Sequence, residues 1–593
     1  MILQSLMQYY ESLAEKGKVP RMGWCYAKVS CAIDLNEDGQ VKAIIPLKVP
    51  EMFGKKEVWV PKQMHVPQMV VRSSGISANF LCDNSKYMLG IDSKGTSQRI
   101  KECFMAARDK HCSILQDSEG RMAKAIIRYF ETWNPDNADV NPVIKAHWEE
   151  LTDGGNLIFC LESEYAQEDE EIKKIWHIYQ ENNSGLVDGI CLVTGEKSEI
   201  SRIHRGIKGV PGAQSSGAAL VSFNAPAFES YGKEQSYNAP VGKYAEFAYT
   251  TALNYLLSEK KYTFQLGDSM VVYWAESAQT QYQDMLKNFF NSNIDNQKEL
   301  EKIFGNLKNG LAVDIDDVKI DLNQRFYILC LAPNAARLSI RFFYENSFGN
   351  ILKNLSDHYE RMAIVKPEWE KEYLSIQEML METGNNKLKD KKLVSNMASL
   401  VLRDILMDDR YPTGLYTEVL ARIRAEQGGI TYGRAAIVKA YLIKNYNMKE
   451  GEKYMGLNEN CNEQAYVLGR LFAVLELIQK DANPGINSTI KDRYFNSACA
   501  TPASVFPILI KLKNSHMKKI ERGSTGLKIQ YEKTITELMG KLNMAETQIG
   551  FPRRLSLEEQ GKFMLGYYHQ VQKRYEKKED KYCLLYTSDA ADE

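Results

Sequence analysis

The sequence RFYILCLAPNAARLSIRFF, residues 325–343, is the last strand-forming part of the chain. Its two halves, Arg325–Ala332 and Arg337–Phe343, are rich in aromatic and aliphatic residues and are parted by Pro333-Asn334, which predicts two strands. From about Ile351 onward the apolar residues recur at helical spacing. The sequence therefore predicts an α+β region over residues 1–350 and an all-α region after it.

Strand-like segments closer to the N-terminus support the α+β prediction. Trp24–Leu35 and Gln40–Leu47 flank a turn containing Asp38-Gly39, a pair that favours a hairpin of antiparallel strands. Further strands are expected at Val58–Val60, Gln68–Val71, Asn156–Leu161, Gly189–Thr194 and Ser269–Trp274. Helical spacing predicts helices near the N-terminus and over 97–131 and 141–150. We therefore expect a sheet region with antiparallel or mixed strands.

The C-terminal region is predicted to be a helical bundle. Its first apolar face is formed by Leu468, Leu471, Phe472, Leu475 and Ile478. Asn483-Pro484-Gly485 and Phe551-Pro552 interrupt the pattern, which is typical of four or five helices around one core. We divide the chain into an α/β domain at 1–350, a helical connecting region at 351–454 and a helical bundle at 455–582.

Charge and cysteine content restrict the class of protein. The net charge is −1, but residues 455–582 carry 20 Lys and Arg against 14 Asp and Glu, so positive charge is concentrated in the bundle. The eleven cysteines form no CxxC pair, which argues against a zinc ribbon or a disulfide framework and favours a reducing, cytoplasmic location. The sequence has no apolar run of transmembrane length and no signal peptide, so we expect no membrane association.

The last eleven residues, CLLYTSDAADE at 583–593, differ in character from the bundle. They can be back-translated into the adapter of a transposase-based sequencing library. We interpret them as a translated artefact and leave them out of the fold prediction.

The segment 203–241 is unusually rich in Gly, Ser, Ala, Asn and Pro and is too long for an ordinary connection. Phe223, Phe228, Tyr231 and Tyr237 are expected to anchor it by burial. Candidate phosphate-binding side chains in and beside it are Arg202, His204, Arg205, Lys208 and Lys233. Candidate contacts to bases and backbone are Gln214, Ser215, Ser216, Asn224, Gln235 and Asn238. An ordered loop whose amides bond its own backbone is an equally good interpretation of this composition.

The sequence offers less support for catalysis than for binding. Asp314, Asp316 and Asp317 form the best acidic cluster, but alternating acids beside Asn309-Gly310 are more typical of a solvated strand. Cys191 and His204 together are too few to fill a tetrahedral metal site. Ser215-Ser216-Gly217 falls short of a hydrolase motif, and 206–212 lacks the Gly-Lys-Ser/Thr ending of a nucleotide-binding loop. We expect no metal, no cofactor and no catalytic residue. A stand-alone metal-dependent nuclease acting on nucleic acid is the alternative.

Several long motifs resemble the large-subunit family of the type I-C CRISPR Cascade complex. They are Arg72–Gly90, Gly209–Val241, Val271–Ala275, Leu331–Phe343, Ala465–Phe495 and Gly566–Gln570. The resemblance implies a non-catalytic subunit that recognises the protospacer-adjacent motif and stabilises the R-loop, while guide RNA reads the target sequence. It also implies five partners: guide RNA, target DNA, the repeated backbone subunit, the RNA-end-binding subunit and a helicase-nuclease.

Two further expectations concern the bundle. Lys511, Lys513, Lys518, Lys519, Arg553 and Arg554 lie on its polar side, where they can bind nucleic-acid backbone or simply face solvent. The family's gene is thought to make a small subunit by internal initiation. Met448 and Met455 are the candidate starts here, and Lys449-Glu450-Gly451 can encode a ribosome-binding sequence just upstream of Met455.

Overall fold

The structure, a computed structural model, describes residues 1–53, 56–70, 75–94, 97–182, 187–290, 297–311, 313–315, 318–384, 395–448, 454–542 and 551–575. These residues form two compact units. The first unit holds residues 1–207 and 219–255, and the second holds 208–218 and the residues from 256 on. The segment 583–593, interpreted above as an artefact, lies outside the described residues.

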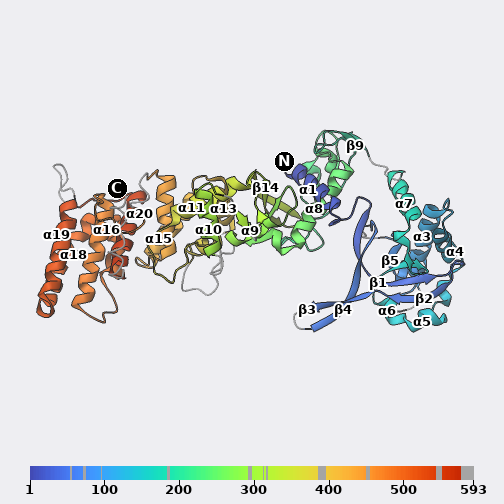
Figure 1. Ribbon diagram of the computed structural model, residues 1–593, viewed down its shortest axis with the longest axis horizontal. Helices are drawn as coiled ribbons and strands as arrows, with labels where there is room; N and C mark the ends of the chain where they lie inside the picture. The colour runs from blue at the N-terminus through green and yellow to red at the C-terminus, as the bar shows by residue number, and fades with distance from the viewer. Residues whose placement is uncertain are drawn as a thin grey trace, which may run out of the picture. The chain divides into compact units, whose positions relative to one another are not determined.

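A mixed sheet is the centre of the first unit (Figure 1). Its strands run in the order β3-β4-β1-β6-β5, with β2 paired to β1 and β7 paired to β6. The β1–β6 pair is parallel and the others are antiparallel, as the sequence predicted for this region. The strands are β1 (Trp24–Leu35), β2 (Val41–Pro46), β3 (Lys48–Phe53), β4 (Lys56–Pro67), β5 (Cys82–Asn84), β6 (Asn156–Leu161) and β7 (Glu164–Tyr165).

The predicted hairpin between β1 and β2 is confirmed. Asn36 organises its turn, because its side-chain oxygen accepts hydrogen bonds from the backbone N–H groups of Asp38 (3.1 Å) and Gln40 (2.8 Å). Gly39 has a φ of +76°, a conformation that glycine adopts without strain. The turn chemistry therefore agrees with the local sequence.

The prediction was wrong for β4. The sequence predicts a short strand at Val58–Val60, ended by Pro61, whereas one strand continues through this proline. The strand can continue because Pro61 pairs only with Lys48 of β3, while pairing of β4 with β1 begins at Lys62. A proline is tolerated where one side of a strand has no partner. A strand was also expected at Gln68–Val71, but the described part of it, residues 68–70, forms none.

Helices cover the sheet of the first unit and form its main core. His111 lies in this core, where its Nε2 accepts the backbone N–H of Leu81 (2.9 Å) and its Nδ1 donates to the carbonyl of Ala107 (2.7 Å). Burial lowers the pKa of His111 to about 4, so the ring is neutral. The helices of the unit are α1 (Ile2–Glu15), α2 (Ser85–Met88), α3 (Gln98–Leu115), α4 (Arg121–Thr132), α5 (Pro142–Ala146), α6 (Trp148–Thr152), α7 (Glu170–Asn182) and α8 (Lys243–Ser258), the last turn of α8 excepted.

The second unit begins with an antiparallel sheet in the order β10-β11-β14-β15. The predicted pair at Arg325–Ala332 and Arg337–Phe343 is confirmed as β14 (Arg325–Asn334) and β15 (Arg337–Ser347), with Ala335 at φ +52° in the turn. The other strands are β10 (Thr263–Leu266) and β11 (Ser269–Ala275), and a separate pair is β12 (Asp314–Ile315) with β13 (Val318–Lys319).

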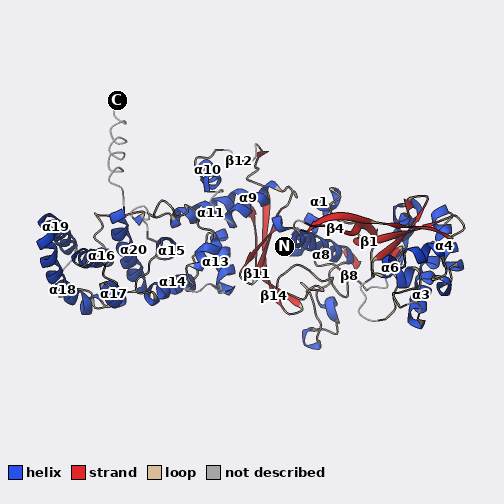
Figure 2. Cartoon of the chain, turned by 90° about the horizontal axis from the view of Figure 1, so that it is seen from below, coloured by secondary structure: helices blue, strands red, loops and turns tan. Residues whose placement is uncertain are grey.

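Helices follow β15 through the rest of the described chain, and Figure 2 shows no strand among them. The predicted fold class, α+β and then all-α, is thus confirmed. The helices of the second unit are α9 (Gln281–Phe290), α10 (Gln297–Lys308), α11 (Phe348–Met362), α12 (Ile376–Met381), α13 (Ser395–Met407), α14 (Thr413–Ala425), α15 (Tyr432–Asn445), α16 (Gln464–Ala482), α17 (Ile490–Ala500), α18 (Pro502–Gly523), α19 (Thr525–Lys541) and α20 (Leu557–Gln572).

The bundle helices share one apolar core with the helices before them. This core extends from Phe264 to Tyr568. The hydroxyl of Tyr416 on α14 donates to the carbonyl of Leu557 (2.7 Å), and that of Tyr568 on α20 donates to the carbonyl of Val365 (2.8 Å). The division at 350 and 455 stays a prediction, and residues on both sides of 455 pack together in this chain.

The motif GYYHQ at Gly566–Gln570 holds α20 against α16. Gly566 lies so close to the carbonyl of Tyr466 that a methyl group there would overlap it. The Tyr567 hydroxyl donates to Glu476 (2.7 Å), and the Tyr568 hydroxyl donates to the Val365 carbonyl. His569 is hydrogen-bonded to the Tyr466 hydroxyl (2.9 Å), and the Gln570 side chain accepts from Arg470 (3.0 Å). Each residue of this motif has a structural role.

Candidate nucleic-acid interface

The candidate residues between 202 and 238 belong to both compact units. Lys208, Gln214, Ser215 and Ser216 lie in the second unit, and Arg202, His204, Arg205, Asn224, Lys233, Gln235 and Asn238 lie in the first. We therefore describe the two groups separately. Their contact with nucleic acid stays a prediction.

His204 and Arg205 bond inside the first unit. Glu246, a buried carboxylate on α8, accepts from the Arg205 backbone N–H (2.8 Å) and from its guanidinium (3.2 and 3.3 Å). The Arg205 guanidinium also lies 4.3 Å from the ring centre of Phe247. His204 is buried, with its Nδ1 2.7 Å from the Tyr249 hydroxyl, and burial lowers its pKa. These two side chains hold the start of the segment against α8.

A tight turn at residues 229–238 presents Tyr231 and Lys233 to solvent. Asn238 closes the turn: its side-chain oxygen accepts the backbone N–H of Ser230 (2.8 Å), and its amide nitrogen donates to the carbonyls of Lys233 (2.6 Å) and Gln235 (2.9 Å). The Asn238 amide thus bonds the loop's own backbone, which was one of the two interpretations of the composition.

The expectation that ring burial anchors the segment is wrong for Tyr231 and Phe228, whereas Phe223 and Tyr237 are half-buried. Tyr231 is 99% exposed and Phe228 is 46% exposed. Hydrogen bonds replace ring burial because the turn is small and polar. They hold Tyr231 (φ +54°) and Gln235 (φ +47°) in the left-handed region, which is costly for both residue types. An ion pair of 3.5 Å joins Glu234 of this turn to Arg202. Tyr231, absent from the predicted contacts, is the most exposed ring of the segment.

Residues 208–218 present a short polar turn on the second unit. Gly209 and Gly212 have φ values of +90° and +79°, and a methyl group at Gly212 would press on Pro333 of β14. The backbone N–H of Gly217 donates to the carbonyl of Gln214 (3.0 Å), which closes the turn and leaves the side chains of Gln214, Ser215 and Ser216 exposed. Lys208 is exposed as well. Gly212 thus allows the close approach of this turn to β14, and Gly209 allows its approach to Leu257.

The candidate cations of the bundle lie on α18 and on the segment before α20. Lys511, Lys518 and Lys519 on α18, and Arg553 and Arg554, are exposed, whereas Lys513 is half-buried. Lys511, Lys518 and Arg522 fall on one face of α18, because residues seven and eleven positions apart lie one above another. Lys519 also donates to the side chain of Asn483 (2.8 Å).

The described residues contain no group of three or more side chains that could hold a metal ion. Asp314 lies in β12, while Asp316 and Asp317 lie outside the described residues. Cys191 is buried and accepts the backbone N–H groups of Gly242 (3.1 Å) and Val193 (3.4 Å). Burial alone would raise the pKa of this thiol, but these N–H groups and Thr194 hold it below its ordinary value.

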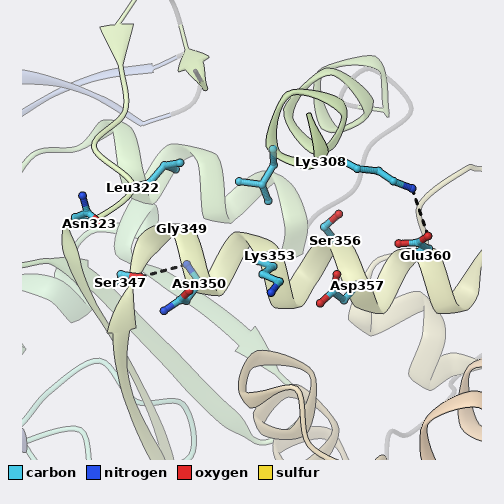
Figure 3. A pocket seen from close by; sticks show the side chains of 11 residues that line it. Lys308, Leu322, Asn323, Ser347, Gly349, Asn350, Lys353, Ser356, Asp357 and Glu360 are labelled. Carbon is cyan, nitrogen blue, oxygen red and sulfur yellow. Dashed lines mark hydrogen bonds and ion pairs between the residues drawn. The ribbon is translucent and has the colours of Figure 1, made fainter. Parts of the chain in front are cut away.

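A surface pocket of about 470 Å³ lies between α10 and α11 (Figure 3). Lys308 and Glu360 form an ion pair across it (3.4 Å), and the Ser347 hydroxyl accepts the backbone N–H of Asn350 at the start of α11 (3.3 Å). Burial raises the pKa of Asp357 in its wall. These contacts stabilise the ends of helices, and none pairs a nucleophile with a base.

No helix among the described residues combines the length and apolar character needed to span a membrane. No curated protein matches the sequence. The family model of the CRISPR-associated protein Cas_Csd1 matches residues 6–575, which cover most of both compact units and every candidate residue described above. The chain therefore belongs to the Cas_Csd1 family of CRISPR-associated proteins.

Proposed function

We propose that this chain is the large subunit of a type I-C CRISPR Cascade complex, in the cytoplasm, and that it binds nucleic acid without cutting it. The family match over residues 6–575 carries the proposal. In this role the chain recognises the protospacer-adjacent motif and stabilises the R-loop, while guide RNA pairs with the target. Its partners are the guide RNA, the target DNA, the backbone and RNA-end-binding subunits and the helicase-nuclease.

In this proposal, different exposed side chains contact the bases and the phosphates of the nucleic acid. The turn of Gln214, Ser215 and Ser216 offers an amide and hydroxyls to base edges, with Lys208 beside it for a phosphate. The cations of α18 and Arg553-Arg554 suit backbone phosphates, which carry no sequence information. We leave His204, Arg205 and Asn238 out of the proposed contacts, because Nδ1 of His204, the guanidinium of Arg205 and the amide of Asn238 bond within the first unit.

The proposal is tested by assembling the chain with guide RNA and the other Cascade subunits and measuring binding to a library of duplexes with varied flanking motifs. Binding that depends on both the guide and the flanking motif supports it. Cleavage of nucleic acid by the purified chain alone in the presence of Mg²⁺ would show that the nuclease alternative is correct.

Replacing Gln214 and Asn224 by Ala is expected to weaken binding to the preferred flanking motif by about 1–3 kcal/mol for each base that the side chains no longer bind, and to relax the preference. A change of Lys208 to Ala should weaken all motifs alike. The measurement is the dissociation constant of the assembled complex for each motif. Gln530, exposed on α19, provides the matched control in Gln530→Ala. If the double variant ranks all motifs as wild type does, the assignment is wrong.

Replacing Lys518, Lys519, Arg553 and Arg554 by Ala is expected to reduce the salt dependence of DNA binding without changing the preferred motif. The slope of log K against log salt becomes shallower by about 0.9 for each phosphate that is no longer neutralised. The control removes four exposed lysines elsewhere, Lys94, Lys145, Lys260 and Lys298, and so changes the net charge equally. Equal slopes in the two variants would mean that the bundle cations only face solvent.

Changing Met455 to Leu is expected to abolish a short C-terminal product of the gene. The side chain of Met455 is 43% exposed, and its carbonyl accepts the N–H of Val365 (2.6 Å), a bond that Leu keeps. Leu should therefore leave the full-length protein intact. The products are compared by mass after expression of both genes. A short product of unchanged mass, or none from the wild-type gene, would exclude this start.

A further inference from the structure

The outer face of β1 and β4 carries a row of rings that the proposed function does not use. Trp24, Tyr26 and Lys28 alternate along β1, and His65 and Gln63 of β4 lie opposite Tyr26 and Lys28. The Trp24 and His65 rings are stacked, with centres 4.9 Å apart and planes at 22°. The centres of Tyr26 and His65 are 5.6 Å apart. We name these five residues the ring face.

Most side chains of the ring face do not contribute to the core. The alternate residues of the same two strands, Ala27, Val29, Met64 and Val66, are buried on the opposite side of the sheet. Trp24 is half-buried against the core that contains Trp176, but Tyr26 is 44% exposed, and His65, Lys28 and Gln63 are exposed. An antiparallel pair with one buried face usually places polar side chains on its outer face, and here it places rings.

The charge beside the rings is positive. Lys28 pairs with no carboxylate among the described residues and stands next to Tyr26 on the same face. Burial, and then the positive charge of Lys173 on α7, lower the pKa of His65. His65 is therefore a neutral ring at physiological pH. Lys173 itself pairs with Glu170 (2.7 Å), which leaves Lys28 as the cation of the face.

We propose that the ring face binds unpaired bases of a single-stranded nucleic acid. Bases stack on Tyr26 and His65, Lys28 contacts a backbone phosphate, and Gln63 is within reach of a base edge. Flat, exposed rings on a sheet together with a cation are how many proteins hold single strands, because every base has a face that can stack. Phosphate and Lys28 are complementary in charge. The inference rests on the proposed function only in that the chain works on nucleic acid; it does not depend on motif recognition by residues 208–238.

The first experiment is photo-crosslinking of the purified full-length chain to oligothymidylate in which single thymines are replaced by 5-iodouracil. This base crosslinks most readily to a ring stacked on it. Peptide mass spectrometry is expected to find the adduct on Tyr26, His65 or Trp24. Adducts found only elsewhere on the chain, or no binding of the oligonucleotide at all, would overturn the proposal. This test needs no variant to fold.

The second experiment compares dissociation constants for the same oligonucleotide. Tyr26→Leu with His65→Leu is expected to weaken binding about 10- to 100-fold, while Tyr26→Phe, which keeps the ring, stays near wild type. Trp369, a lone ring that is 83% exposed, provides the control Trp369→Leu. An equal loss in the control would contradict a role of the ring face. If the double variant binds the oligonucleotide normally but no longer assembles with the other subunits, the face binds protein and the proposal is wrong.

The outcomes for the two proposals are distinguishable. Crosslinks at the ring face together with a complex that ignores guide and flanking motif would leave this inference standing and refute the proposed function. Motif-dependent binding with no crosslink at the ring face would support the proposed function and refute this inference.

Discussion

Gly469→Ala is expected to destabilise the C-terminal bundle by about 3 kcal/mol, because the helices α16 and α20 touch through their backbones at this position. A methyl group at Gly469 would overlap the carbonyl of Phe563 and press on the backbone nitrogen of Tyr567. Neither obstacle is a side chain that could rotate away. One turn further along, Gly566 of α20 lies equally close to the carbonyl of Tyr466. The two helices would therefore have to separate along their length.

Urea unfolding, with hydrogen exchange followed in peptides of α16 and α20, measures the effect. Gly540→Ala on α19 is the matched control, since a methyl group there meets nothing within 4 Å. Because Gly540 lies in the last turn of α19, that control should gain no more than the roughly 0.5–1 kcal/mol expected in a helix interior. If Gly469→Ala and Gly540→Ala shift the urea midpoint in the same direction, the close contact between α16 and α20 is absent.

The sequence predicted those parts of the fold whose cause is local. The β1–β2 hairpin follows from Asn36 and Gly39, which make the turn by themselves. The strands β14 and β15 follow from two apolar runs around Pro333-Asn334. The course of β4 through Pro61 could not be predicted, because it depends on which neighbouring strand pairs at that point.

The candidate site was predictable in composition but not in geometry. Residues 203–241 were expected to be ordered, and their composition suggested phosphate contacts and internal hydrogen bonds equally well. The contacts that a given side chain makes depend on its partners in the folded chain. Arg205 bonds to Glu246, 41 positions away, and Asn238 bonds to the backbone of its own turn. Tyr231 is exposed because hydrogen bonds rather than ring burial close that turn, a difference that composition does not reveal.

Helical spacing also failed to identify buried charge. Arg434 on α15 is completely buried, although arginine is usually exposed. Its guanidinium donates to both carboxylate oxygens of Glu426 (2.6 and 3.2 Å) and to the carbonyls of Gly429 (2.6 Å) and Glu382 (3.2 Å). These acceptors come from the turn before α15 and from the end of α12, so the arginine joins three segments of the second unit.

Replacing Arg434 by Met is therefore expected to destabilise the second unit by about 3–5 kcal/mol. Met fills a similar volume but donates no hydrogen bond, so a largely buried carboxylate and the carbonyls of Glu382, Gly384 and Gly429 lose this donor. Arg410→Met is the control, because Arg410 is exposed near the start of α14. That change should alter stability by less than about 0.5 kcal/mol.

A second substitution separates the effect of charge pairing from that of packing. If the cost of Arg434→Met comes from the charge left on Glu426, then Glu426→Gln in the same chain should recover part of it, because a neutral amide is less costly to bury. The four chains of this cycle are compared by their urea midpoints, and the coupling between the two positions is expected to be at least about 1 kcal/mol. Additive effects of the two changes would show that Glu426 is solvated and that Arg434 stabilises the unit through its carbonyl contacts alone.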